Sequence, residues 1–141
     1  FRTVGAALVD TFKRLGVDGA WYKHQGAVRV GGKKIATILL SEIENLYIVN
    51  VVAFLAAMDT DPLFKVLWVP PEIKDKAVEP STSVAEVSSQ ELGDAAAAVE
   101  TFKNALLAVL NEALGVSFET GKLTRDELLA YEKNRALAGR L

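Results

Sequence analysis

Val28–Leu40 reads V-R-V-G-G-K-K-I-A-T-I-L-L, two runs of strand-forming residues on either side of a glycine pair. Gly31 and Gly32 can both take the positive φ angles that a two-residue hairpin turn requires. Such a turn fixes the register of its strands, so successive side chains beyond it point to opposite faces of the sheet. The stretch therefore predicts a β-hairpin.

Two lysines, Lys33 and Lys34, follow the turn directly. Strict alternation predicts that Lys34 shares a face with Ala36 and Ile38, while Lys33 points to the opposite face. A lysine held at the start of a strand beside small apolar side chains can present a fixed positive charge to a phosphate or a carboxylate. The alternative is that both are solvated turn lysines, because lysine is mostly exposed in proteins.

The composition is that of an ordinary globular domain, with 141 residues, 50% of them hydrophobic and 24% charged. A formal net charge of −2 lacks the basic excess typical of nucleic-acid binding. No apolar run reaches the roughly 18 residues of a membrane span, and the first residues do not resemble a secretory signal. We therefore predict a cytoplasmic protein with no nucleic-acid or membrane partner. The start at Phe1 rather than Met agrees with a fragment, a processed product or one half of a larger unit.

The reactive residue types are few. The chain has no cysteine and one histidine, His24. Disulfides, thiolate metal sites, a cysteine nucleophile and a multi-histidine metal site are thereby excluded. We predict no metal site built from protein ligands, and any catalysis must use other polar side chains or the backbone.

Helical periodicity marks three segments of the chain. In the first, apolar residues recur about four apart from Val4 to Leu15, and Gly16 follows as a stop. In the last, Thr124 and Glu127 form a capping box that opens a helix. Helices are predicted over residues 4–15, over residues 94–114 and from residue 124 onward.

Strand-forming runs lie between these helices. Leu46–Met58 is dense in Val, Ile, Leu, Tyr and Phe, which fits a strand buried on both faces of a sheet. Shorter runs predict strands at Trp21–His24 and Val116–Glu119. This order of elements predicts a single α+β domain over residues 1–141, with a mixed or antiparallel sheet flanked by helices.

Three sequence segments, taken in order, point to a family. The first is G-G-K-K-I-A-T-I-L-L at Gly31–Leu40; the second is F-K-V-L-W-V-P-P-E-I-K-D-K at Phe64–Lys76, followed by S-T-S-V-A-E-V at Ser81–Val87. The third is G-K-L-T-R-D-E-L-L-A at Gly121–Ala130. Together they resemble the C-terminal half of the catalytic domain of lipoate-protein ligases. Biotin-protein ligases share the fold and a similar glycine-lysine hairpin, but they lack the second and third segments.

The resemblance implies an enzyme that makes lipoyl-AMP from lipoate and ATP, with Mg²⁺, and transfers the lipoyl group to a lysine of an acceptor protein. In the family, the lysine that precedes an aliphatic residue contacts the acyl carbonyl and the adenylate phosphate, and that role falls on Lys34. A positioned ammonium stabilises the charge that develops there, most strongly in a water-poor pocket. Ala36, Thr37 and Arg29 are candidate substrate-binding residues. Arg29 can bind a phosphate bidentately, or it is simply a surface arginine of a strand.

The sequence also departs from the family pattern. Gly26 and Ala27 stand where the family has Asn-Asp, and Thr37 stands where it has glycine. The double-arginine, triple-glycine motif that cradles lipoate and nucleotide belongs to the family's N-terminal half and has no counterpart here. Either a second chain supplies that half, as in a heteromeric ligase, or the chain was cut, or the activity is lost. The alternative functions are a non-catalytic partner subunit of such a ligase and a biotin-protein-ligase-like protein.

Overall fold

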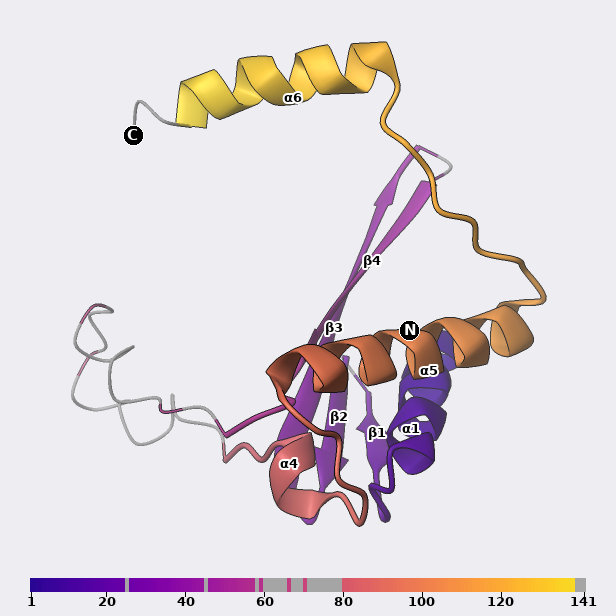
Figure 1. The fold of residues 1–141 in the computed structure, drawn as a ribbon, viewed down its shortest axis with the longest axis vertical. Coiled ribbons are helices and arrows are strands. Elements are labelled where there is room, and N and C mark those ends of the chain that lie inside the picture. The colour runs from indigo at the N-terminus through magenta and orange to yellow at the C-terminus, as the bar shows by residue number, and fades with distance from the viewer. Residues whose placement is uncertain are drawn as a thin grey trace.

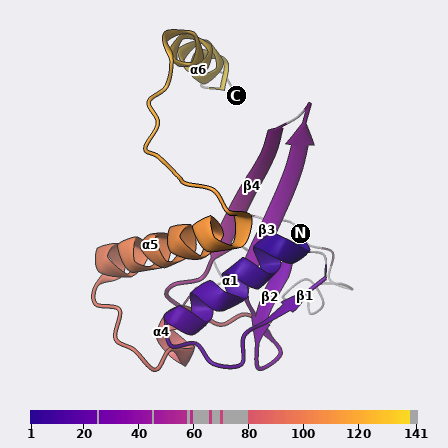
Figure 2. The same cartoon turned by 90° about the vertical axis from the view of Figure 1, so that its right-hand side faces the viewer.

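The computed structural model describes residues 1–24, 26–44, 46–57, 59, 66, 70 and 80–138, with side chains up to residue 135. A four-stranded sheet and two helices packed on one of its faces make the body of the molecule (Figure 1). Helix α1 (Arg2–Arg14) lies on the sheet, and helix α5 (Ala95–Leu114) packs against α1 (Figure 2). The predicted α+β class with an antiparallel sheet flanked by helices is confirmed.

The sheet follows chain order, and every neighbouring pair of strands is antiparallel. This arrangement needs only short connections between consecutive strands, which places sequence neighbours side by side in space. The strands are β1 (Trp21–Lys23), β2 (Ala27–Val30), β3 (Lys33–Ile43) and β4 (Leu46–Ala53).

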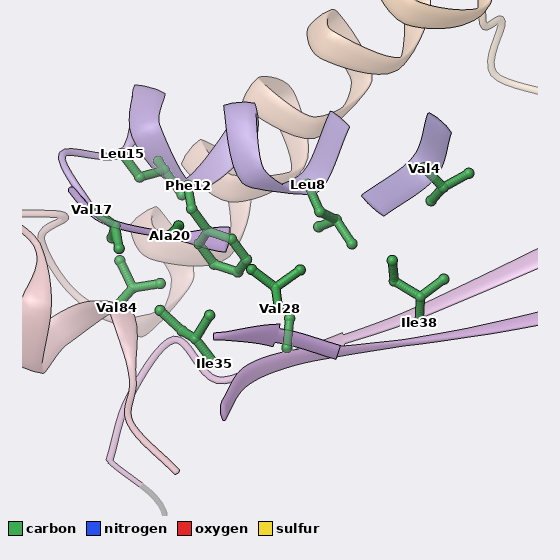
Figure 3. Packing of buried hydrophobic residues seen from close by; sticks show 11 residues of the cluster. Val4, Leu8, Phe12, Leu15, Val17, Ala20, Val28, Ile35, Ile38 and Val84 are labelled. Atoms are coloured by element: carbon green, nitrogen blue, oxygen red, sulfur yellow. The ribbon is translucent and has the colours of Figure 1, made fainter. Parts of the chain in front are cut away.

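One apolar cluster between α1 and the sheet forms the core (Figure 3). The four-residue spacing predicted for the first helix is confirmed, because Val4, Leu8 and Phe12 are all buried against the sheet. Burial of a side chain as large as that of Phe12 contributes roughly 1.5–3 kcal/mol. Gly16 ends the helix at φ 73°, as predicted. The cluster consists of Val4, Leu8, Phe12, Leu15, Val17, Ala20, Val28, Ile35, Ala36, Ile38 and Val84.

The predicted glycine hairpin is confirmed. Strands β2 and β3 flank Gly31 and Gly32, whose φ angles of 54° and 82° are those of a primed two-residue turn. A side chain at either position would meet no atom within 4 Å, so the positive φ alone explains the two glycines.

A β-bulge changes which side chains share a face of β3. Val28 pairs with Ala36, but the next residue, Arg29, pairs with Lys34, so Ile35 is an extra residue in β3. Ile35 and Ala36 are both fully buried in the core as a result. The prediction that Lys34 shares a face with Ala36 is wrong, because the extra residue shifts the alternation by one and turns Lys34 to the opposite face.

Beyond the helices, β3 and β4 continue as a projecting two-stranded arm, residues 39–43 and 46–50 (Figure 1). Leu46 and Tyr47 are 70% and 67% exposed there. The prediction of a strand buried on both faces is wrong for β4, since none of the described residues covers the arm. The connection between β3 and β4 is tight, because Ile43 still pairs with Leu46 and Glu44 has a φ of 55°.

The C-terminal part contains one predicted helix on the body and one that stands apart. The Asp94 side chain accepts a hydrogen bond from Ala97 N (2.9 Å) at the start of α5, and Gly115 ends it at φ 63°. Residues 116–119 form no strand, contrary to prediction.

Helix α6 (Arg125–Ala138) begins with the predicted capping box, in which Thr124 N donates to the Glu127 carboxylate (2.7 Å). Figures 1 and 2 both place α6 away from the sheet. Of the helices that the structure describes, none has the length and apolar character needed to cross a membrane. Apart from Val66 and Pro70, the segment Phe64–Lys76 lies outside the described residues.

Candidate functional site

Lys34 lies in a row of side chains that crosses the sheet. Trp21 on β1 pairs with Arg29 on β2, and Arg29 pairs with Lys34 on β3. Residues directly opposite each other in antiparallel strands point to the same face. Because Val28, the neighbour of Arg29, is buried under α1, this row occupies the face that the helices leave uncovered. We call it the outer face of the sheet.

The backbone of Lys34 is held on its other side by a segment from far along the chain. Lys34 N donates to Pro80 O (2.8 Å), and Thr82 N donates to Lys34 O (2.8 Å). Lys34 and Ser81 thereby form a parallel bridge. The main chain of Lys34 is thus held between Arg29 of β2 and Ser81. Its side chain is half-buried and lies on the outer face. No local sequence pattern predicts this contact, because it joins residues from distant parts of the chain.

A capping box fixes the segment that borders Lys34. Short helix α4 (Val84–Val87) begins after Ser83, whose N and Oγ donate to the Glu86 carboxylate at 2.8 and 2.7 Å. These hydrogen bonds, with the charge of nearby Lys33 as a smaller cause, hold the pKa of Glu86 below its usual value. The ionised form of Glu86 therefore orders the chain immediately after Ser81 and Thr82.

The Arg29 side chain forms a hydrogen bond with the glycine turn. Its Nη1 donates to Gly32 O at 2.6 Å, which ties the arginine to the turn that precedes the two lysines. The side chain is half-buried beside Lys34 in the cross-strand row. A direct contact of Arg29 with substrate stays a prediction; the contact with the turn gives this residue a positioning role in addition.

The other two predicted binding residues point in opposite directions. Thr37 pairs with Ala27 and Val52, and it is half-buried on the outer face with Lys34. The Ala36 side chain is fully buried in the core, so any contact of Ala36 with a substrate has to use its backbone. The structure thus brings Lys34, Arg29 and Thr37 together on one face and separates the Ala36 side chain from them.

Gly26 has a structural reason to be glycine. Its φ is 89°, and a Cβ atom at this position would overlap with Ile38 O. Gly26 O also accepts a hydrogen bond from Ile38 N (2.6 Å), which holds the two backbones together. The asparagine that the family has here would not fit this backbone, so its replacement follows from the local fold. Ala27 lies on the outer face and brings no carboxylate to the site.

The described residues offer no closed pocket around Lys34. A small cavity of about 70 Å³ beside Ser81 is far below the roughly 300–1,000 Å³ of typical ligand pockets. A larger hollow of about 550 Å³ lies between α4, the chain that follows it and the start of α5, and none of the predicted site residues lines it. Lys34 lines neither of these hollows.

No cation cage is found in the part of the chain that the structure describes. Within it, no group of three or more His, Asp or Glu side chains is placed to hold a metal ion. Mg²⁺ is usually bound by one or two carboxylates together with substrate phosphates. Mg²⁺ therefore stays a prediction from the resemblance.

Solved structures of ligases share this fold. A bi-partite lipoate protein ligase from Thermoplasma acidophilum matches with a TM-score of 0.74 and 23% identity, over 94% of this chain and 51% of that chain. A lipoate-protein ligase A bound with ATP matches with a TM-score of 0.66 and 20% identity, over 94% and 52% of the two chains. No protein-family model and no curated protein sequence matches the chain.

A biotin protein ligase from Aquifex aeolicus is similar over a smaller share, with a TM-score of 0.52, 16% identity and coverage of 82% and 46%. The chain spans about half the length of all these structures. The predicted resemblance is confirmed at the level of the fold. The chain has the biotin and lipoate-protein ligase fold, over about half of the length that the matched ligases have.

Proposed function

We propose that this chain is one part of an ATP-dependent lipoate-protein ligase and that Lys34 acts in its active site. The observation that carries the proposal is the position of Lys34, half-buried on the outer face and fixed between Arg29 and Ser81. The likeness to lipoate-protein ligases supports the choice of reaction, and a neighbour with bound lipoic acid supports the choice of substrate.

The reaction has two steps. The lipoate carboxylate attacks the α-phosphorus of ATP, which gives lipoyl-AMP and releases pyrophosphate. The ε-amine of an acceptor lysine then attacks the lipoyl carbonyl, loses a proton and displaces AMP. In both steps negative charge grows on oxygen atoms of the reacting groups. The Lys34 ammonium stabilises that charge, and the Thr37 hydroxyl beside it supplies a hydrogen-bond donor on the same face.

The rest of the site comes from a second polypeptide. The described residues form no closed pocket around Lys34, and the chain spans about half of the matched ligases. A face that bears a charged group and a bound acyl chain has to be covered before water is excluded and the charge acts at full strength. Residues 1–141 are proposed to form a single domain that the second chain completes. The Thermoplasma ligase is described together with its E2 lipoyl domain, which supports a lipoyl domain as the acceptor.

Replacement of Lys34 tests the proposal. In the complex with its partner, Lys34→Met keeps the apolar stem and removes the charge, and we expect lipoylation of the acceptor to fall about a hundredfold or more. Formation of lipoyl-AMP and acceptor mass are the measurements. Lys33→Met is the matched control, because Lys33 is exposed and precedes Lys34 on the other face. It should leave both rates unchanged.

A non-catalytic role in the same ligase is the second candidate. The absence of a carboxylate at Ala27 favours it. In that case Lys34→Met leaves acylation and assembly unchanged, and such a result would overturn the catalytic proposal. Attachment of biotin rather than lipoate to the acceptor would favour the biotin-ligase alternative instead.

A further inference from the structure

The edge of the sheet at β4 is open. In the part of the chain that the structure describes, β4 pairs with β3 and has no strand on its other side. Ile38 directs its N–H to Gly26, away from β4, so its partner Val51 directs its own backbone groups away from β3. Backbone direction alternates along a strand, so Tyr47 and Val49 also present N–H and C=O groups to the open edge. These groups are ready to pair with an added strand.

The outer face beside this edge is mostly apolar, with Ser41 and Asn50 as its polar residues. Counting in steps of two from Thr37, the outward residues of β3 are Leu39, Ser41 and Ile43. The same face continues along β4 through the residues that pair with them and with Thr37, which are Leu46, Ile48, Asn50 and Val52. Monomeric soluble proteins rarely leave an apolar surface of this kind uncovered. The exposed fractions are 56% for Leu39, 57% for Ile43, 70% for Leu46, 44% for Ile48 and 51% for Val52.

We propose that the β4 edge and the outer face of the arm form one docking surface for a second polypeptide. This partner adds a strand to β4 and lays apolar side chains on Leu39, Ile48 and Val52. The proposal rests on the proposed function, and it names the surface through which the two parts of the ligase join. Strand addition gives affinity through main-chain hydrogen bonds, and the apolar face gives specificity.

The occupant is the missing part of the ligase rather than a second copy of this chain. Two copies joined through their β4 edges make a longer sheet but leave both outer faces, and both copies of Lys34, uncovered. The matched structures have about twice the length of this chain, so a second part of that length is large enough to cover the face. Thr37 and Val52 form a direct pair on the outer face, so the apolar surface is continuous with the site. A partner seated on the arm therefore reaches the lysine.

Site-specific photocrosslinking in the source cells tests this docking surface. The full chain carries a photoreactive residue at Val49 on the edge, at Ile48 on the outer face, or at Glu100 on the exposed side of α5 as the control. We expect Val49 and Ile48 to crosslink one second polypeptide that contains the double-arginine, triple-glycine motif, and Glu100 to give no such product. Crosslinks only to another copy of this chain, or equal products from all three positions, would overturn the proposal.

Two matched substitutions separate the edge from the face. Val49→Pro removes one outward N–H, whereas Val49→Thr keeps it and the strand-forming shape. We expect Val49→Pro to weaken the purified complex about tenfold or more and Val49→Thr to leave it within about threefold. Ile48→Glu should weaken it similarly through the face. Circular dichroism of each free variant shows whether it folds, and equal binding by Val49→Pro and Val49→Thr overturns strand addition.

The docking proposal and the catalytic proposal can be refuted independently of each other. Crosslinking and affinity require neither lipoate nor ATP. A partner that docks at Val49 while Lys34→Met retains full activity leaves the docking proposal standing and removes the catalytic one. A complex that forms normally with Val49→Pro and Ile48→Glu, yet loses activity with Lys34→Met, gives the reverse result.

Discussion

At the scale of single residues, the backbone conformation explains why Gly26 lacks the side chain that the family motif has at this position. Gly26 stands in place of a family asparagine, which alone suggests a relaxed catalytic demand. Its positive φ and its closeness to Ile38 O show instead that only glycine fits there. The sequence does not reveal this, because φ at a single glycine depends on how two strands approach each other.

Substitution of Gly26 by alanine should be much more costly than the same change at Gly19. Both residues have positive φ, 89° and 74°, but a Cβ atom at Gly19 meets nothing within 4 Å. We expect Gly19→Ala to lower the free energy of unfolding by about 1 kcal/mol, the typical cost of a left-handed alanine. Gly26→Ala should lower it by about 3 kcal/mol or more, because backbone atoms must also move. Urea unfolding measures both, and equal costs would contradict the role of Ile38 O.

At the scale of elements, local signals predict the turns and caps, and tertiary contacts decide the rest. The Gly31-Gly32 turn, the end of α1 at Gly16 and the capping box at Thr124 follow from short-range chemistry. The bulge at Ile35 does not follow from short-range chemistry. It places the Ile35 side chain, in addition to that of Ala36, in the core cluster that also contains Val84. The face on which Lys34 lies depends on that bulge. The sequence offers Lys34 as a candidate, which stays a prediction, and it does not reveal which residues lie beside this lysine on the sheet.

The cap of α4 makes local stability depend on pH. The Ser83 hydrogen bonds lower the pKa of Glu86 below its usual 4.5 in the folded chain. A lowered pKa stabilises the fold above the unfolded value, and the contribution is lost as the pH falls through the folded pKa. We expect Glu86→Gln to flatten the decline of the free energy of unfolding below pH 4.5.

Glu100→Gln on the exposed side of α5 is the control for this measurement, and it should leave that decline unchanged. An identical pH profile for wild type and Glu86→Gln, from urea unfolding between pH 6 and pH 3, would contradict the cap's contribution. The same data report on the order of the segment beside Lys34, because Glu86 holds Ser83 in place.

At the scale of the whole molecule, the body and the arm differ in what stabilises them. The body buries its apolar side chains between α1 and the sheet, whereas the arm leaves most of its own exposed. Sequence composition does not separate the two, since the same Val, Ile and Leu residues that read as a buried strand in β4 lie outside the core. Only the arrangement of the helices decides which apolar runs are covered.

Hydrogen exchange of the isolated chain should show this division. Amides in the body, such as that of Ile38, are expected to exchange only through global unfolding, because they lie beneath α1. Outward amides of the arm, such as those of Tyr47 and Val49, should exchange at nearly the rate of an unstructured peptide. Addition of the partner should slow the arm amides and leave the body unchanged. Protection of Val49 in the isolated chain at neutral pH would contradict the open edge.

The composition of the core also bears on the order of folding. All of its buried residues except Val84 come from the first 38 residues of the chain. Contacts between residues that are close in sequence form quickly, and such a segment can collapse while later residues are still being synthesised. We expect the body to reach its native packing independently of the partner, whereas the arm is covered only when the partner binds. The proposed partner would then meet a folded body, and pairing of its strand with the arm would complete the association.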